Sequence, residues 1–261
     1  MNRNQCMQTS RARLTECGTV RVRRLTLLFL LCLCAVTIPF DALTWALNMQ
    51  LSRLSGLRAA TDRSRILFWE VVLSAAVSLA AALWQMGYQA FSLRVCRGEE
   101  VSFRTFPIPF RRFDQFLLLL LLQTVLIFLW SLLFMIPGIV AAYRYRLAAF
   151  ILLDDPSRTA SEAISLSRRM TYGHKLELFF LDLSFLWYTI PLSVFTGLTL
   201  LPLYFPALSS MGYQAALYAA SIILPLIWQC AFMPRVSVTL ACAYDQLREL
   251  DQRRAAALFG D

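Results

Sequence analysis

The chain has 261 residues, of which 58% are hydrophobic and 16% are charged, and its mean hydropathy is +0.58. A typical soluble domain is roughly 45–50% apolar and about 25% charged. Three stretches, 71–93, 115–143 and 183–234, contain no Asp, Glu, Lys or Arg. Each exceeds the roughly 20 residues that a membrane-spanning helix needs, so the composition excludes an ordinary soluble enzyme and predicts an integral membrane protein.

The positive charge is concentrated between the apolar stretches. The net charge is +9, and Lys175 is the only lysine among the 25 basic residues, so arginine carries almost all of this charge. Arginines that flank membrane segments contact anionic lipid headgroups, and no nucleic-acid recognition motif accompanies them. The sequence therefore favours the lipid bilayer, and not nucleic acid, as the partner of the basic segments.

The seven cysteines predict no cofactor or metal site. Their number is odd, they form no CxxC pair, and four of them lie in or beside apolar stretches. This pattern supports neither a disulfide framework nor a zinc site. We expect the cysteines to be small apolar filler.

The N-terminal part joins a basic segment to an apolar one. Residues 1–24 contain six arginines and are expected to form a cytoplasmic tail, and a first membrane helix is predicted at 25–47. The basic segment is longer than that of a secretory signal peptide, so an uncleaved anchor is favoured over a cleaved signal. Pro39 is expected to kink this helix, and residues 48–65 are expected to form a polar link.

We expect an all-α fold, a polytopic bundle of about six membrane helices in one domain at 25–248, followed by a cytoplasmic tail at 249–261. The helices are predicted at 25–47, 66–93, 114–136, 139–153, 176–201 and 214–244. The fourth has only fifteen residues, so it is either a compact span or a re-entrant segment. A charge-free turn bounded by Pro202, Pro206 and Gly212 separates the last two helices.

The link at 94–113 interleaves five arginines with four phenylalanines. This composition is typical of a segment at the level of the lipid headgroups. Pro107 and Pro109 exclude one continuous helix there.

Residues 157–173 predict an amphipathic helix that lies along the cytoplasmic interface. Thr159 and Glu162 have the spacing of a capping box, and Gly173 is a suitable C-terminal residue. One face carries the least polar side chains of the segment, which are Ala160, Ala163, Ile164, Ser167 and Met170. The candidate interfacial residues on and after this helix are Glu162, Arg168, Arg169, His174 and Lys175.

The distribution of basic residues predicts the orientation of the chain. With six spans and a cytoplasmic N-terminus, the cytoplasmic segments hold 18 basic residues and the outer segments hold four, all of them at 48–65. The positive-inside rule therefore places both termini in the cytoplasm and the protein in the cell membrane.

A set of motifs in the middle of the chain resembles one family. The motifs are Phe134-Met135-Ile136-Pro137-Gly138-Ile139, Tyr143-Arg144-Tyr145, Asp155-Pro156, Glu162-Ala163-Ile164, Ser167, Met170, Gly173-His174-Lys175, Phe179 and Leu181-Asp182-Leu183-Ser184-Phe185. In this order they are similar to a bacterial family of multi-spanning membrane proteins catalogued as domain of unknown function 975. They more distantly resemble the membrane region that precedes some glycerophosphodiester phosphodiesterase domains. The resemblance implies an architecture and a membrane address, but no reaction.

Charged residues at membrane depth are costly and are therefore the candidate functional groups. Asp182 in the fifth helix and Arg144 or Arg146 in the fourth fall at similar heights, so we expect Asp182 to pair with one of the two arginines. Three roles are open for these charged residues. The pair fixes the register of the two helices, it forms a substrate or ion site, or the long side chains extend to the lipid headgroups instead. The candidate intramembrane residues are Pro137, Gly138, Tyr143, Arg144, Tyr145, Arg146, Asp182 and Arg235.

No enzyme signature accompanies these residues. His174 is the only histidine, and the chain contains neither a P-loop nor a GxSxG motif. Asp154-Asp155 before Pro156 reads as a helix stop more readily than as a divalent-ion site. We therefore expect a non-enzymatic bundle that contacts lipid headgroups, another membrane protein or a second copy of itself. The alternative is a small transporter or channel that uses the Pro137-Gly138 helix break and the intramembrane charges Arg144 and Asp182.

Overall fold

The computed structural model describes residues 3–53, 57–197 and 211–259, and every regular element in these ranges is a helix. The predicted all-α bundle is therefore confirmed. Five of the described helices are long and apolar enough to cross a membrane, and a sixth span results if α9 and α10, which meet at a bend of 51°, are taken together. These helices are compatible with a multi-pass membrane protein.

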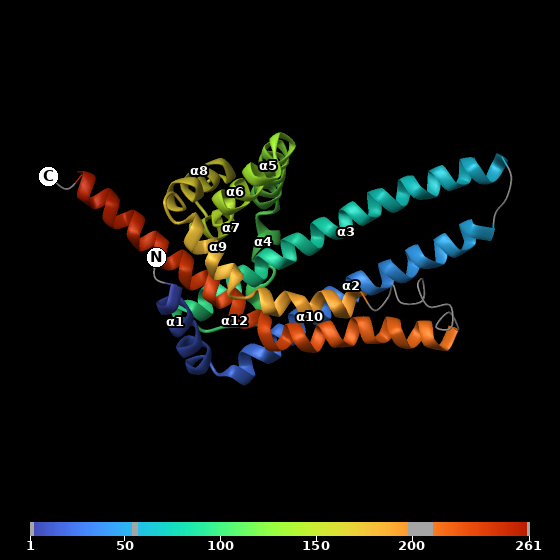
Figure 1. The fold of residues 1–261 in the computed structure, drawn as a ribbon, viewed down its shortest axis with the longest axis horizontal. Coiled ribbons are helices and arrows are strands. Elements are labelled where there is room, and N and C mark those ends of the chain that lie inside the picture. The colour runs from blue at the N-terminus through green and yellow to red at the C-terminus, as the bar shows by residue number, and fades with distance from the viewer. Residues whose placement is uncertain (1–2, 54–56, 198–210, 260–261) are drawn as a thin grey trace.

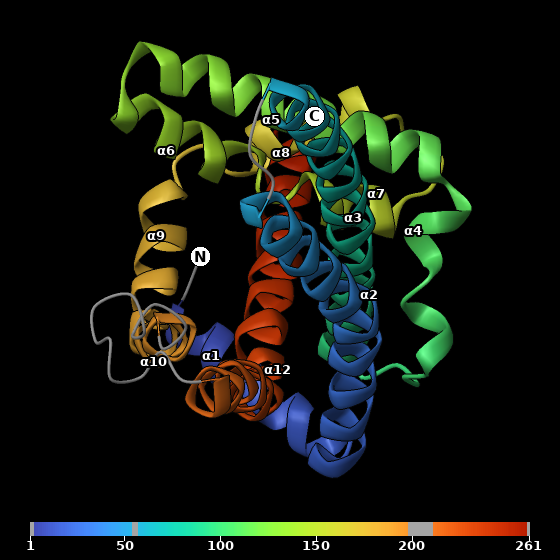
Figure 2. The same cartoon turned by 90° about the vertical axis from the view of Figure 1, so that its right-hand side faces the viewer.

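The helices from α3 to α10 follow one another with short connections. In chain order they are α1 (Arg3–Glu16), α2 (Thr19–Arg53), α3 (Leu57–Arg97), the short turns η1 (Phe103–Thr105) and α4 (Ile108–Arg111), α5 (Phe113–Leu133), α6 (Met135–Tyr145), α7 (Ala148–Asp154), α8 (Ala160–Met170), α9 (Lys175–Leu183), α10 (Leu186–Gly197) and α12 (Met211–Phe259). In Figure 1, α2, α3, α10 and the first half of α12 extend to one side of the molecule. Figure 2 shows the α5–α6 hairpin projecting sideways from them.

The buried side chains are concentrated at one end of the long helices. We call this end the base, and it comprises α1, residues 19–30 of α2, residues 83–106, α7, α8 and residues 233–250 of α12. Aromatic rings fill its centre: Phe29, Tyr88, Phe91 and Phe106 are all fully buried, and the rings of Phe91 and Phe106 have centroids 5.2 Å apart. The base therefore has a core of its own.

The remaining parts of the long helices expose apolar side chains. We call residues 31–44 of α2, 64–82 of α3 and 216–232 of α12 the arms. Trp69, Val71 and Ile227 in the arms are 63–66% exposed. Side chains of this kind remain uncovered only if the surroundings are also apolar.

The N-terminal segment and the expected polar link differ from the sequence prediction. Residues 3–16 form a helix whose Cys6, Ser10 and Leu14 are buried, because α1 packs against α12 and α3. The Ser10 hydroxyl lies 2.9 Å from the Thr239 hydroxyl on α12. The link predicted at 48–65 is helical at 48–53 and 57–65. Charged residues on a long helix end are solvated as well as those in a loop, so polarity alone did not identify a loop.

The cysteine prediction is corrected in one respect. Cys96 on α3 and Cys242 on α12 form a disulfide, with their Cα atoms 5.7 Å apart. Both residues are buried in the base, 146 positions apart in sequence. Sequence spacing gives no information on such a long-range pair.

Two other predictions have different outcomes. The amphipathic helix is confirmed as α8: Thr159 and Glu162 make the capping box, and Gly173 adopts a φ of +83°. Its apolar face packs against α7 and α5 within the base, so α8 needs no bilayer to cover it. The turn predicted around Pro202 and Pro206 lies outside the described residues.

Candidate functional site

A cluster of charges around Arg97 joins three helices of the base. The Arg97 guanidinium at the end of α3 lies 2.6 Å from the Asp154 carboxylate at the end of α7 and 2.8 Å from Asp245 on α12. Asp154 also accepts hydrogen bonds from Arg248 and, at 2.9 Å, from the Tyr244 hydroxyl. The Asp154 side chain is only 8% exposed, but its partners compensate its charge. The cluster therefore acts as a structural clamp.

The neighbouring acid serves as a helix stop. Asp155 accepts hydrogen bonds from the Ser157 backbone and hydroxyl and from Arg158, and these bonds lower the pKa of its exposed carboxyl below the usual value. In the described part of the chain, no group of three His, Cys, Asp or Glu side chains is arranged to hold a metal ion.

The structure brings Asp182 together with Arg146 and Tyr143. The Arg146 guanidinium donates to the Asp182 carboxylate, and the Tyr143 hydroxyl donates to the same oxygen at 2.8 Å. Arg144 points elsewhere, with its guanidinium carbon 5.9 Å from the centre of the Trp130 ring. Of the two arginines that the sequence offered, Arg146 is thus the partner of Asp182.

Asp182 lies next to an irregular part of the bundle. α9 ends at Leu183, and α10 begins at Leu186 after a bend of 51°. On the other side of the Asp182–Arg146 pair, α6 ends at Tyr145. The backbone carbonyls at this helix end accept hydrogen bonds from other helices, with Ser167 donating to the Arg144 carbonyl and Gln123 donating to the Tyr145 carbonyl. These bonds satisfy carbonyls that the helix end leaves without intrahelical donors.

The Pro137-Gly138 pair does not interrupt a membrane helix. The chain reverses at Phe134, between α5 and α6, and both residues lie in the first turn of α6. Gly138 is buried, and a Cβ atom there would overlap the Ser131 hydroxyl and lie 2.9 Å from the Ser131 Cα. The glycine thus allows α6 to pack closely on α5 in a hairpin.

The candidate interfacial residues lie on α8 and at the start of α9, where two of them contact the last turns of α12. The Arg254 guanidinium can only donate, so His174 Nε2 accepts its hydrogen bond. His174 Nδ1 therefore carries the proton and donates to the Glu177 carboxylate at 3.0 Å. Arg169 pairs with Asp251 at 2.6 Å. Arg168 and Arg169 line a cavity of about 750 Å³ between α5, α8 and the end of α12. Glu162 is used by the capping box, and Lys175 is the first residue of α9.

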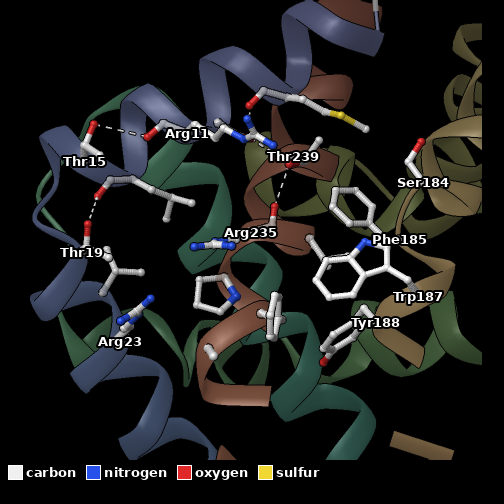
Figure 3. Close-up of a pocket in the computed structure, with 18 of the residues that line it drawn as sticks. Arg11, Thr15, Thr19, Arg23, Ser184, Phe185, Trp187, Tyr188, Arg235 and Thr239 are labelled. Carbon is white, nitrogen blue, oxygen red and sulfur yellow. Dashed lines mark hydrogen bonds between the residues drawn. The ribbon is translucent and has the colours of Figure 1, made fainter. Parts of the chain in front are cut away.

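A different cavity lies where the base meets the arms. It has a volume of about 500 Å³ and is bounded by α1, the start of α2, the start of α10 and the middle of α12. Figure 3 shows Arg11, Arg23 and Arg235 on one side of it and a group of aromatic rings on the other. The labelled rings are those of Phe185, Trp187 and Tyr188, and Phe232 also lines the cavity. We call it the basic–aromatic cavity.

The lining of this cavity is positively charged and has no acidic residue. Arg3, Arg11, Arg23 and Arg235 contribute four guanidinium groups, and Ser10, Thr15, Thr19, Ser184 and Thr239 contribute hydroxyls. Among the ion pairs of the described residues, none includes one of these four arginines. The Arg235 guanidinium carbon lies 5.6 Å from the centre of the Phe232 ring, which holds it at the cavity wall.

Of the residues that line this cavity, the sequence predicted only Arg235 as a candidate site residue, and Ser184 and Phe185 entered only as part of a family motif. The cavity joins residues near positions 11, 23, 187 and 235, and its form depends on the docking of α1, which the sequence predicted as part of a basic tail at 1–24. One signal was present in the sequence: Arg23, Phe185 and Arg235 each stand at the edge of a long apolar stretch. That pattern places them at one depth but does not make them neighbours.

Comparisons with known proteins give a family and no activity. No curated protein and no solved structure matches this chain. Residues 132–250 match the family described as "Protein of unknown function (DUF975)", whereas the distant resemblance to glycerophosphodiester phosphodiesterases is not shown. The matched segment runs from the end of α5 into the second half of α12 and supplies two walls of the basic–aromatic cavity, those from α10 and α12. Residues 132–250 of this chain are thus similar to the DUF975 family.

Proposed function

We propose that this protein is a non-enzymatic, multi-pass protein of the cell membrane that works by contact with anionic lipid headgroups. The observation that supports this proposal is the position of exposed arginines at the base end of the apolar segments. Arg23 and Arg24 precede the apolar part of α2, Arg111 precedes α5, and Arg235 follows the apolar half of α12. Arginine at such a boundary gains from the negative potential of anionic lipids.

The base and both termini face the cytoplasm in this proposal. The arginine count favours that side, and the base brings α1 and the second half of α12 to the same end of the molecule (Figure 1). Reporter fusions at residues 60 and 261 test the orientation. We expect a cytoplasmic signal at 261 and an external signal at 60, and a cytoplasmic signal at both positions would contradict the crossing of α2.

Lipid analysis of the purified protein tests the proposed function itself. The protein is extracted from its membrane in a mild detergent, and the lipids that remain bound are compared by mass spectrometry with those of the whole membrane. We expect anionic phospholipids to be enriched several-fold in the bound fraction, and the enrichment should fall when the salt concentration rises. A bound fraction with the composition of the bulk membrane would contradict the proposal.

A protein partner is the other form of contact function. The α5–α6 turn exposes Phe134, Met135 and Ile136 to 70–79%, a small apolar surface that suits another membrane protein or a second copy of this chain. Cross-linking in membranes before mild solubilisation tests this reading. A stoichiometric partner linked through the turn would support it, and recovery of the uncross-linked chain alone would contradict it.

A small transporter is the second candidate function, and one observation favours it. The bend between α9 and α10 lies directly after Asp182, and broken helices next to buried charges form substrate sites in several transporter folds. Flux of labelled ions and small solutes into reconstituted vesicles tests this candidate. Transport that is lost in Asp182→Asn would support it, and vesicles as tight as protein-free controls would contradict it.

A further inference from the structure

We infer that the basic–aromatic cavity binds the headgroup of one anionic glycerophospholipid. This inference rests on the proposed function and deepens it, because it names the site and the class of lipid. It differs from general headgroup contact in requiring one defined site with a limited number of arginines.

The charges of the cavity suit a phosphodiester. Arg11, Arg23 and Arg235 come from three different helices and meet at one side of the cavity (Figure 3). No ion pair among the described residues includes one of these three arginines, so their guanidinium groups are available to a ligand. Guanidinium groups bind phosphate oxygens through short, charge-assisted hydrogen bonds, and a phosphate here would find no acidic residue in the lining.

The depth of the cavity also suits a lipid headgroup. Two of the lining helices change from polar to apolar at this level, α2 after Arg24 and α12 before Arg235, and α10 contains no charged residue from its start at Leu186. A headgroup at this level leaves its acyl chains beside the arms. Ile190 and Val194 on α10 and Ile227 on α12 are 57–63% exposed there and offer an apolar path.

The aromatic side of the cavity fits the boundary between headgroup and acyl chains. The rings of Trp187 and Phe232 meet edge to face, with centroids 4.9 Å apart, and Tyr188 lies beside Phe232. Tryptophan and tyrosine are enriched at membrane–water interfaces, where one part of the ring is apolar and another is polar. A free phosphate ion would use the arginines but not these rings, so the combination indicates a lipid.

The second cavity is a weaker candidate for the same ligand. Its arginines share the lining with Asp251, which pairs with Arg169 at 2.6 Å. A bound phosphate would have to compete with that carboxylate. The basic–aromatic cavity has no such competitor in its lining.

A pair of matched double variants tests the inference. Arg23→Gln/Arg235→Gln removes two arginines of the cavity. Arg13→Gln/Arg253→Gln removes two arginines outside it, which form exposed pairs with Glu16 and Glu249, so both variants lose the same charge. Phosphatidylglycerol and phosphatidylcholine with identical chains are titrated into each protein in detergent, and binding is counted by native mass spectrometry. Equal melting temperatures establish that the variants are folded.

We expect wild-type protein to bind one phosphatidylglycerol more tightly than phosphatidylcholine. The cavity variant should lose about tenfold or more in phosphatidylglycerol affinity, since charge-assisted bonds are lost, whereas the control should stay within about twofold. Glycerol 3-phosphate should not displace the lipid. If the cavity variant does not fold, the single variant Arg11→Gln is compared with Arg253→Gln in the same way.

Three results would overturn the inference. Equal losses in the two double variants would leave general headgroup contact intact but remove the defined site. Displacement by glycerol 3-phosphate at concentrations near those of the lipid would assign the cavity to soluble phosphate esters. Equal affinity of wild-type protein for the two lipids would contradict both the site and the proposed function.

Discussion

The two halves of α3 show how differently one helix behaves in the arms and in the base. Phe68 in the arm is 62% exposed, whereas Phe91 in the base is fully buried and touches the rings of Tyr88 and Phe106. Both are phenylalanines on the same continuous helix. The difference lies in the surroundings: the base covers its apolar side chains with protein, and the arms leave theirs to the bilayer.

This contrast separates two sources of stability. The base is held by aromatic packing, by the Arg97 cluster and by the docking of α1. The arms contribute little packing among themselves, so their position depends on the apolar solvent around them. Substitutions in the base should therefore destabilise the protein in detergent, and similar substitutions in the arms should not.

The largest expected effect is that of Phe91→Ala. Loss of a fully buried phenylalanine should lower the free energy of unfolding by about 4 kcal/mol, and Phe68→Ala should change it by less than about 1 kcal/mol. Thermal unfolding of both variants in one detergent checks this difference. Equal losses of unfolding free energy in the two variants would show that the arm, like the base, is packed against protein.

The next effect is that of Gly87→Ala in the base. A Cβ atom at Gly87 would overlap the carbonyl oxygen of Phe106. The overlap should cost about 3 kcal/mol, offset by about 1 kcal/mol of improved helix propensity. Gly197→Ala is the matched control, because no atom of the described residues lies within 4 Å of its Cβ position. A Gly87→Ala protein as stable as the control would mean that the link at 101–106 is not docked on α3.

Asp154→Asn should have a moderate effect. Asparagine keeps the shape but leaves Arg97 and Arg248 with a weaker partner, and both arginines have some access to solvent. We expect a loss of about 1.5 kcal/mol. The control Glu249→Gln affects an exposed pair whose atoms are 3.8 Å apart, and its effect should stay below about 0.5 kcal/mol. Chemical unfolding of the two variants side by side distinguishes these values.

The smallest effect concerns the Cys96–Cys242 pair. The structure shows the oxidised form of this pair, whereas a base in the cytoplasm would keep both thiols reduced in cells. Adding reductant to freshly isolated membranes should then change stability by less than about 0.5 kcal/mol. Acid quenching and alkylation of intact cells measures the thiol state directly. A disulfide already present in cells, with a loss of about 2–5 kcal/mol on reduction, would place the base on the outer side.

Local patterns in the sequence were sufficient for the helical fold and for α8. The Thr159–Glu162 spacing and the buried face of Ala160, Ala163 and Ile164 depend on residues within one or two turns, so they can be predicted from sequence. The sequence predicted that Asp182 pairs with Arg144 or Arg146, because the lengths of the helices fix the approximate depth of each residue in the membrane. Hydropathy thus determines which segments are helical and at what height they lie.

The contacts between distant segments could not be predicted in this way. Arg97 binds residues 57 and 148 positions away, Cys96 pairs across 146 positions, and α1 docks through the Ser10–Thr239 contact. These pairs depend on how helices rotate and pack, and hydropathy carries no information on rotation. The basic–aromatic cavity belongs to the same class, because it exists only after α1, α2, α10 and α12 have come together.

Photolabelling from within the bilayer tests the division between arms and base most directly. The unmodified protein is reconstituted with a phospholipid that carries a photoreactive diazirine at the end of an acyl chain, and the adducts are mapped by peptide mass spectrometry. We predict adducts on exposed arm residues such as Val71 and Ile227 and none on Tyr172, which is 75% exposed and lies just after α8 of the base. If Tyr172 were labelled as strongly as Val71, the division into arms in the bilayer and a base outside it would be contradicted.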